Sequence, residues 1–138
     1  MKNVEFLYSE DDCDIVDKLE RHCSSLVKRL ELFTIIKDNV GEISDNDNLP
    51  NLVLVFLSSN FISDDKLMDK LDYYYELRQK GKLSLMPIYV SAIDKDCNPL
   101  YEITGYPSNK QGLLTFNTRE IDSMLVEAVG KIKNIINR

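Results

Sequence analysis

The stretch LVLVFL, residues 52–57, constrains the fold more than any other part of this chain. Its six residues are all apolar and show no alternation with polar residues. A strand with one solvent-facing side alternates between apolar and polar residues, whereas a strand covered on both faces in a parallel sheet does not. We therefore predict a buried central strand at 52–57, with helices on both sides of its sheet.

Other apolar runs extend this pattern along the chain. Strands are predicted at 4–8, 32–36, 83–90 and 112–116. Between them, apolar residues recur at three- and four-residue spacing, which predicts amphipathic helices. The buried stripes are Ile15, Leu19, His22, Cys23 and Leu26 in 12–28; Leu67, Leu71, Tyr74 and Leu77 in 64–80; and Ile121, Leu125, Ala128, Ile132 and Ile135 after 117. Alternating strands and helices predict an α/β fold with a parallel sheet, and one domain over 1–138.

Capping signals support two of the helix starts. Ser9 with Asp12, and Asn117 with Glu120, have the spacing of a capping box. Each pair stands within three residues of the first residue of a predicted apolar stripe. We therefore expect helices to begin close to these two positions.

Charge and cysteine content exclude several classes of function. The formal net charge of −6 disfavours a broad phosphate-binding face, so we expect no nucleic acid as a partner. No apolar run is long enough to cross a membrane, and no signal peptide is visible. The three cysteines form no CxxC pair. Reduced thiols and a cytoplasmic location are the resulting expectation.

Common catalytic motifs are missing from the sequence. Neither GxGxxG nor GxxxxGK[ST] occurs, so no dinucleotide fingerprint or P-loop is present. The single histidine, His22, lies on or beside a buried helical stripe. A Ser-His-Asp triad has no other histidine to use, and a zinc site would need more ligands. We predict no metal site.

Ligands of parallel sheets bind beyond the carboxyl ends of the strands. The segments at those ends are 8–12, 37–51, 58–65 and 91–107. The second one, KDNVGEISDNDNLPN, has no helical stripe. Loops of this length inside a compact domain are uncommon and tend to be functional, although a plain connector is the alternative.

The order and spacing of these segments resemble a bacterial Toll/interleukin-1 receptor (TIR) domain over nearly the whole chain. Four features carry the resemblance: Tyr8-Ser9 after the first strand, the Ser-x-x-Phe pattern from Ser58 to Phe61 after the third, Pro87-Ile88 in the fourth, and Pro107 followed by Phe116 before the last helix. The resemblance implies a flavodoxin-like three-layer fold with a five-stranded parallel sheet of order 2-1-3-4-5. It also implies a ligand cleft at Tyr8, Ser9, Ser58 and Phe61.

One departure from the family concerns the segment after the second strand. The family usually has a helix there, preceded by the loop through which TIR domains associate. Here the chain reaches the third strand too soon, so we expect that helix to be shortened or missing. The interaction loop is then expected at 38–51, with the residues Asp38, Gly41, Glu42, Asp45 and Asn48.

A second departure concerns catalysis. Enzymatic TIR domains cleave the nicotinamide glycosidic bond of NAD, and the resemblance places their essential glutamate near Lys70 or Leu71, where no glutamate stands. Asp69, Asp72 and Glu76 are the nearest candidates. Helical spacing puts these carboxylates off the buried stripe, so we predict that none of them lines the cleft.

The expected function follows from these two departures. We predict a non-catalytic signalling or assembly module without a cofactor, which contacts copies of itself or other TIR-containing proteins, in bacterial antiviral defence as the family resemblance implies. One alternative is an NAD glycohydrolase that uses Asp69 or Asp72 on the ribose. Another is a sensor that binds NAD or a related nucleotide without cleaving it. The serine-rich SSNFIS is expected to satisfy local backbone groups.

Overall fold

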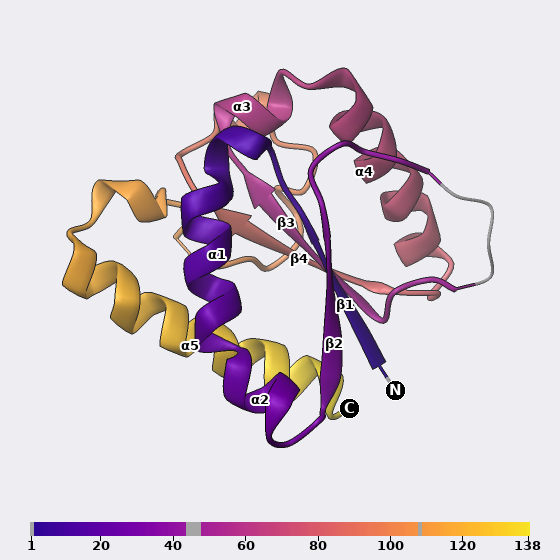
Figure 1. The fold of residues 1–138 in the computed structure, drawn as a ribbon. Coiled ribbons are helices and arrows are strands. Elements are labelled where there is room, and N and C mark those ends of the chain that lie inside the picture. The colour runs from indigo at the N-terminus through magenta and orange to yellow at the C-terminus, as the bar shows by residue number, and fades with distance from the viewer. Residues whose placement is uncertain (1, 44–47, 108) are drawn as a thin grey trace.

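Four parallel strands form the centre of the molecule. The computed structural model describes residues 2–43, 48–107 and 109–138 (Figure 1). The strands are β1 (Lys2–Leu7), β2 (Phe33–Asp38), β3 (Leu52–Leu57) and β4 (Ser84–Tyr89), in the order β2-β1-β3-β4. All six residues of β3 are buried. The predicted α/β fold with a parallel sheet and a buried strand at 52–57 is therefore confirmed.

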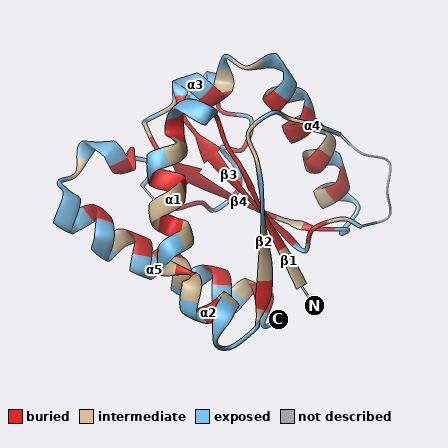
Figure 2. Ribbon diagram, viewed as in Figure 1, coloured by how far each residue is buried: buried red, intermediate tan, exposed pale blue. Residues whose placement is uncertain are grey.

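Helices cover both faces of this sheet. The helices α1 (Cys13–His22), α2 (Ser24–Lys28) and α5 (Thr118–Ile136) lie on one face, and α3 (Ser59–Ile62) and α4 (Asp65–Gln79) lie on the other (Figure 1). Side chains of β3 alternate between two apolar clusters: Leu52, Leu54 and Phe56 join the α1–α5 side, and Val53, Val55 and Leu57 join the α4 side. The buried residues concentrate on the sheet and on the inner stripes of the helices (Figure 2).

The predicted fifth strand at 112–116 is wrong. Leu113–Thr115 form a 3₁₀ helix, and the sheet among the described residues has four strands. Tyr106 makes a single parallel bridge beside Ile88, with hydrogen bonds of 2.8 Å to Pro87 and Tyr89. On the side of this bridge toward Leu85, the ladder would need an N–H from Pro87, which proline does not have. Pro87 therefore limits the pairing of the residues before Tyr106 and has no bearing on 112–116.

Two details at the first helix also differ from expectation. The predicted continuous helix over 12–28 is broken at Cys23 into α1 and α2. Ser9 accepts a hydrogen bond from the Asp11 backbone N–H, 3.4 Å away, and caps a 3₁₀ turn over Glu10–Asp12. No capping box forms there, because the Asp12 carboxylate bonds elsewhere. At the last helix the Asn117 and Glu120 capping box is present as predicted.

The helix after β2 was expected to be shortened or missing. The described residues of this segment, 39–43 and 48–51, contain no helix. Gly41 packs closely on α4, since a Cβ at this position would lie 2.6 Å from the Lys66 carbonyl oxygen. Its φ of +87° lies in the left-handed region that favours glycine. This part of the loop is therefore docked on α4.

Among the described residues, none of the helices combines the length and the apolar character that a membrane crossing requires.

Gly41→Ala tests how tightly the loop is docked on α4. We expect this variant to lose more stability in urea unfolding than Gly81→Ala. Both glycines have positive φ, so both variants pay roughly 1–2 kcal/mol for the backbone conformation. Only Gly41 also faces a clash, because no atom lies within 4 Å of a Cβ built at Gly81. Equal losses in the two variants would contradict the close contact with α4.

Candidate functional site

The carboxyl edge of the sheet holds a small buried polar cluster. The Ser58 hydroxyl donates to Asp12 Oδ2 at 2.5 Å and accepts from the Phe61 backbone N–H at 3.1 Å. The Asn60 side-chain amide donates to Asp12 Oδ1 at 3.4 Å. Asp12 and Ser58 are both buried. The cluster ties the turn after β1 to the start of α3, and it confirms that Ser58 satisfies a local backbone group.

The four predicted ligand-binding residues do not line an open cleft. Tyr8 packs edge-on against Phe56 in the α1–α5 cluster, and Phe61 is fully buried in the opposite cluster beside α4. Ser9 and Ser58 are buried and cap local helices. Burial also raises the pKa of the Tyr8 hydroxyl. Ligand binding by these residues stays a prediction, and in this conformation it would require their side chains to move.

The three carboxylate candidates on α4 lie on its outer side. Asp69, Asp72 and Glu76 are exposed, whereas the stripe that includes Leu67 and Leu71 is buried. Helical spacing predicted this orientation, and the structure confirms it. The Ser58 hydroxyl makes its polar contacts with Asp12 and Phe61, not with these three carboxylates.

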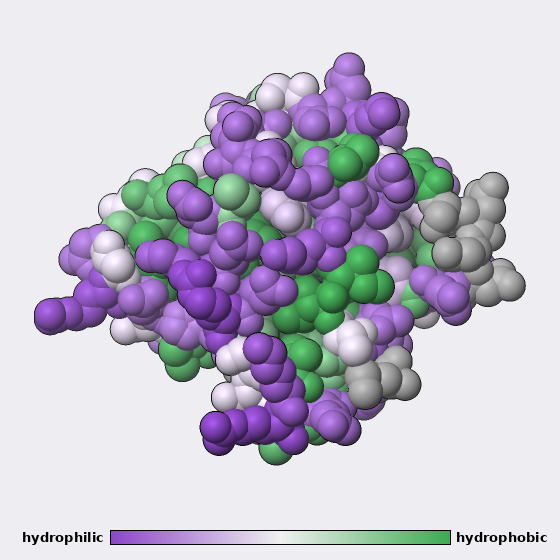
Figure 3. Space-filling view, in the orientation of Figure 1, coloured by the Kyte–Doolittle hydropathy of each residue, from purple (hydrophilic) through white to green (hydrophobic). Residues whose placement is uncertain are grey.

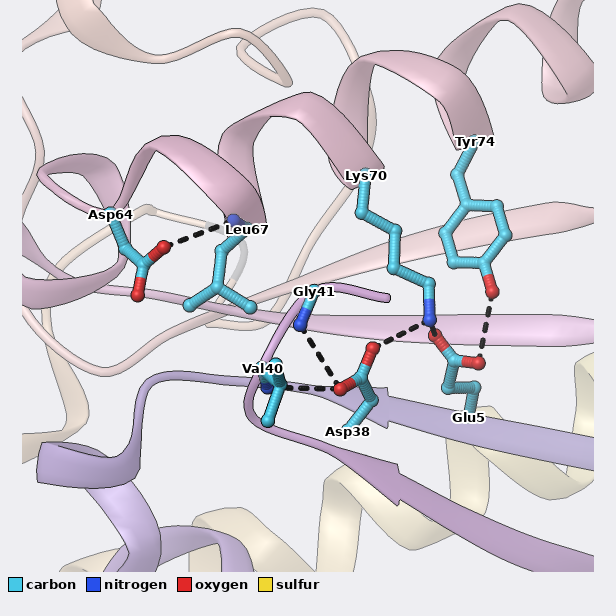
Figure 4. Close-up of polar contacts among 8 residues, drawn as sticks. All are labelled: Glu5, Asp38, Val40, Gly41, Asp64, Leu67, Lys70 and Tyr74. Carbon is cyan, nitrogen blue, oxygen red and sulfur yellow. Dashed lines mark hydrogen bonds and ion pairs between the residues drawn. The ribbon is translucent and has the colours of Figure 1, made fainter. Parts of the chain in front are cut away.

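Lys70 occupies the inner side of α4 instead. Its side chain extends toward β1 and β2 and ends between two carboxylates (Figure 4). The ammonium Nζ lies 2.6 Å from Asp38 Oδ2 and 3.2 Å from Glu5 Oε2. Lys70 and Glu5 are only 6% and 5% exposed. A buried charge is costly unless it is paired, so these ion pairs hold α4 to both strands.

Glu5 and Tyr74 complete this buried network. The Tyr74 hydroxyl donates to Glu5 Oε1 at 2.9 Å, and Lys70 Nζ lies 5.3 Å from the centre of the Tyr74 ring. Glu5 Oε2 has the Lys70 charge nearby but no well-aligned hydrogen bond. Burial therefore raises the pKa of Glu5, against the lowering effects of Lys70 and Tyr74. The pKa of Tyr74 is raised as well, first by burial and then by Glu5.

Asp38 links the network to the loop after β2. Burial alone would raise its pKa, but hydrogen bonds from Lys70 and from the backbone N–H groups of Val40 and Gly41 lower the pKa below its usual value. The two N–H bonds to Asp38 Oδ1 are 2.9 and 3.1 Å long (Figure 4). Asp38 thus orients the first turn of the loop while its other oxygen binds Lys70.

The remaining predicted loop residues are placed only in part. Glu42 and Asn48 are exposed, and Gly41 is half-buried against α4. Asp45 lies outside the described residues. The structure brings Asp38 and Gly41 together through one carboxylate oxygen, whereas Glu42 and Asn48 have no part in the buried network.

A small pocket lies beside the network. Its volume is about 200 Å³, and its walls include Glu5, Ile36, Ile43, Lys70 and Tyr73. Ligand pockets commonly have about 300–1,000 Å³, so the described walls enclose less space than a dinucleotide needs. Among the described residues, no group of three or more His, Cys, Asp or Glu side chains is placed to hold a metal ion.

Sequence reasoning missed Lys70 and Glu5 as partners, although each is a charged residue at a position that the pattern predicts to be buried. Lys70 stands three residues after Leu67 and four before Tyr74, on the buried side of the helix. Glu5 stands in the middle of an otherwise apolar run. An acid and a base at positions predicted to be buried each require a partner of opposite charge. Asp12 carried no comparable signal.

Comparison with protein-family models and with curated protein sequences finds no match to this chain. The fold and the buried network define an α/β protein with a doubly wound parallel sheet. The TIR resemblance rests on the motifs and their order.

Lys70→Met tests how much the ion pairs of Lys70 contribute to the free energy of unfolding. We expect a loss of about 3–5 kcal/mol in the free energy of unfolding, because the buried Glu5 and the half-buried Asp38 are left without a cation. Lys66→Met, on the exposed side of the same helix, is the matched control and should change little. If Lys70→Met fails to fold, adding Glu5→Gln should recover part of the stability. Equal losses in Lys70→Met and Lys66→Met would contradict this account.

Glu5→Gln tests the raised pKa of the carboxyl. A raised pKa in the folded state makes the folded chain bind more protons than the unfolded chain. The contribution of Glu5 to stability is therefore full below the unfolded pKa and is lost as the pH rises through the folded pKa. We expect the stability of Glu5→Gln relative to the parent chain to rise as the pH increases above the usual glutamate pKa of 4.5. Urea unfolding at several pH values measures this difference, and a pH-independent difference would refute it.

Proposed function

We propose that this chain is a signalling or assembly module that acts through contacts with copies of itself or with other TIR-containing proteins. The TIR resemblance motivates this proposal and also suggests bacterial antiviral defence as its setting. The main support for this proposal is that Lys70 is buried and paired with two carboxylates. Near the position where an enzymatic TIR domain would have its glutamate, this chain has a buried lysine already paired with Glu5 and Asp38.

An ion-paired lysine is poorly suited to the chemistry of glycosidic cleavage. The developing oxocarbenium ion is positive and requires a nearby negative charge. Lys70 supplies the opposite charge, and the three carboxylates Asp69, Asp72 and Glu76 are exposed on the outer side of α4. The pocket beside Lys70 is also small. These features favour a binding function over NAD hydrolysis.

Exposed apolar side chains near the loop support a protein contact. Ile36, Val40 and Ile43 are 47%, 48% and 48% exposed. All three lie on β2 or in the first residues after it, and apolar surface gathers along β2 in the space-filling view (Figure 3). Exposed apolar patches often mark protein interfaces. The contact between Asp38 and Lys70 holds the base of this surface in place.

Light scattering after size-exclusion chromatography tests the association. We expect the parent chain to form oligomers at high concentration, and Val40→Ser with Ile43→Ser to remove them, because the change makes this surface polar. Leu114→Ser with Val126→Ser is the matched control. Both residues are apolar and exposed, and they lie elsewhere on the surface. A monomeric parent chain that also fails to bind other TIR domains would refute the proposal, and so would unchanged association of the loop variant.

Nicotinamide release from NAD separates the assembly module from the enzyme. We expect none from concentrated or crowded protein, because Asp69, Asp72 and Glu76 are exposed and the inner side of α4 carries Lys70 instead. Release that is lost in the variant with Asp69, Asp72 and Glu76 all replaced by alanine would favour the glycohydrolase instead. Calorimetry with NAD and ADP-ribose distinguishes the sensor, for which binding without cleavage is the expected result.

A further inference from the structure

A basic groove lies at the β4 edge of the sheet. Its volume is about 590 Å³. The charged residues of its wall are Arg78, Lys131 and Arg138, and the wall contains no carboxylate. Within the described residues, none of these three side chains takes part in an ion pair. Three unpaired cations in one groove contrast with the net charge of −6 of the whole chain.

The groove also borders an open stretch of strand. Tyr106 bonds to Pro87 and Tyr89, which places the backbone groups of these residues on the outer side of β4. Because backbone groups alternate along a strand, the N–H and C=O of Leu85 point to the same outer side. The bridge at Tyr106 is isolated, and no described strand pairs with β4 beside Leu85. An unpaired edge of this kind is a template for another strand.

The cations stand on both sides of this edge. Arg78 comes from the last turn of α4, which covers one face of the sheet. Lys131 and Arg138 come from α5 and the residues after it, which cover the other face. Successive side chains of an added strand would point alternately to these two faces. Consecutive acidic residues would therefore each meet a cation.

We propose that this groove binds an extended acidic segment of a partner protein, which adds to the edge of β4 as a short fifth strand. Main-chain hydrogen bonds to Leu85 would align the segment, and its carboxylates would pair with Arg78, Lys131 and Arg138. The proposal does not depend on the assembly function, because β4 and β2 form opposite edges of the sheet.

Fluorescence anisotropy with a labelled probe peptide, four glutamates flanked by serines, tests the charge contacts. We expect binding that weakens with added salt and is lost when glutamine replaces glutamate in the peptide. Arg78→Gln and Lys131→Gln should each weaken binding by about three- to fivefold, as expected for exposed charge pairs. Lys133→Gln is the matched control, since it removes the same charge from the same helix outside the groove, and it should bind like the parent chain.

Strand addition has its own test. A peptide methylated on alternate backbone nitrogens keeps its charges but loses ladder hydrogen bonds, so we expect at least tenfold weaker binding. Amide exchange of Leu85, followed by NMR, should slow when the unmodified peptide is added. Equal binding of the methylated peptide together with unchanged Leu85 exchange would overturn strand addition.

Other occupants of the groove give different results. If inorganic tripolyphosphate binds and the peptide does not, the groove is a site for small polyanions and the proposal is wrong. If Lys131→Gln abolishes self-association of the chain and the peptide does not bind, the occupant is a second copy, and the proposal is again wrong. Unchanged peptide affinity in both Arg78→Gln and Lys131→Gln would exclude the groove as the binding site of the peptide.

Discussion

The position of Lys70 between Glu5 and Asp38 constrains most of the arrangement around it. An ammonium group out of contact with water needs compensating negative charge, and the two carboxylates come from β1 and β2. The helix α4 therefore has to pack at one depth over both strands. The same contact sets the direction of the chain after β2, because the second oxygen of Asp38 binds the backbone of Val40 and Gly41.

The connection from β2 to β3 is a loop over its described residues, 39–43 and 48–51. In a doubly wound sheet, the connection from β2 to β3 usually carries a helix that covers the sheet on one face. Here the described residues of that connection are not helical, and the polar contacts of Lys70 and Tyr74 stand over β1 in its place. Ile36, Val40 and Ile43 are exposed beside this network.

The two edges of the sheet differ in chemistry for local reasons. At the β2 edge, the loop presents apolar side chains over a network of fixed charges. At the β4 edge, Pro87 ends the pairing after one bridge and leaves Leu85 next to three cations. An apolar surface and a basic groove suit different partners.

Much of the fold was determined by the sequence itself, through patterns that act over short distances. The unbroken apolar run of β3, the stripe of α4 and the capping box of Asn117 and Glu120 all appear as predicted, because each depends on neighbouring residues. The local role of Ser58 after β3 was also predicted, since its hydroxyl accepts a hydrogen bond from a backbone N–H three residues away. The fifth strand was predicted wrongly, since Leu113–Thr115 form a 3₁₀ helix where a strand was expected.

Only the tertiary structure decided which charges meet. Glu5 and Lys70 are 65 residues apart, and Tyr74 lies 69 residues from the same carboxylate. Spacing within a helix or strand tells which side a residue faces but not which residue of another element it will meet. The network, and with it the course of the loop, depends on the register of β1 against β2 and on the depth of α4 over both. Those quantities are set by packing of the whole core, which no local pattern records.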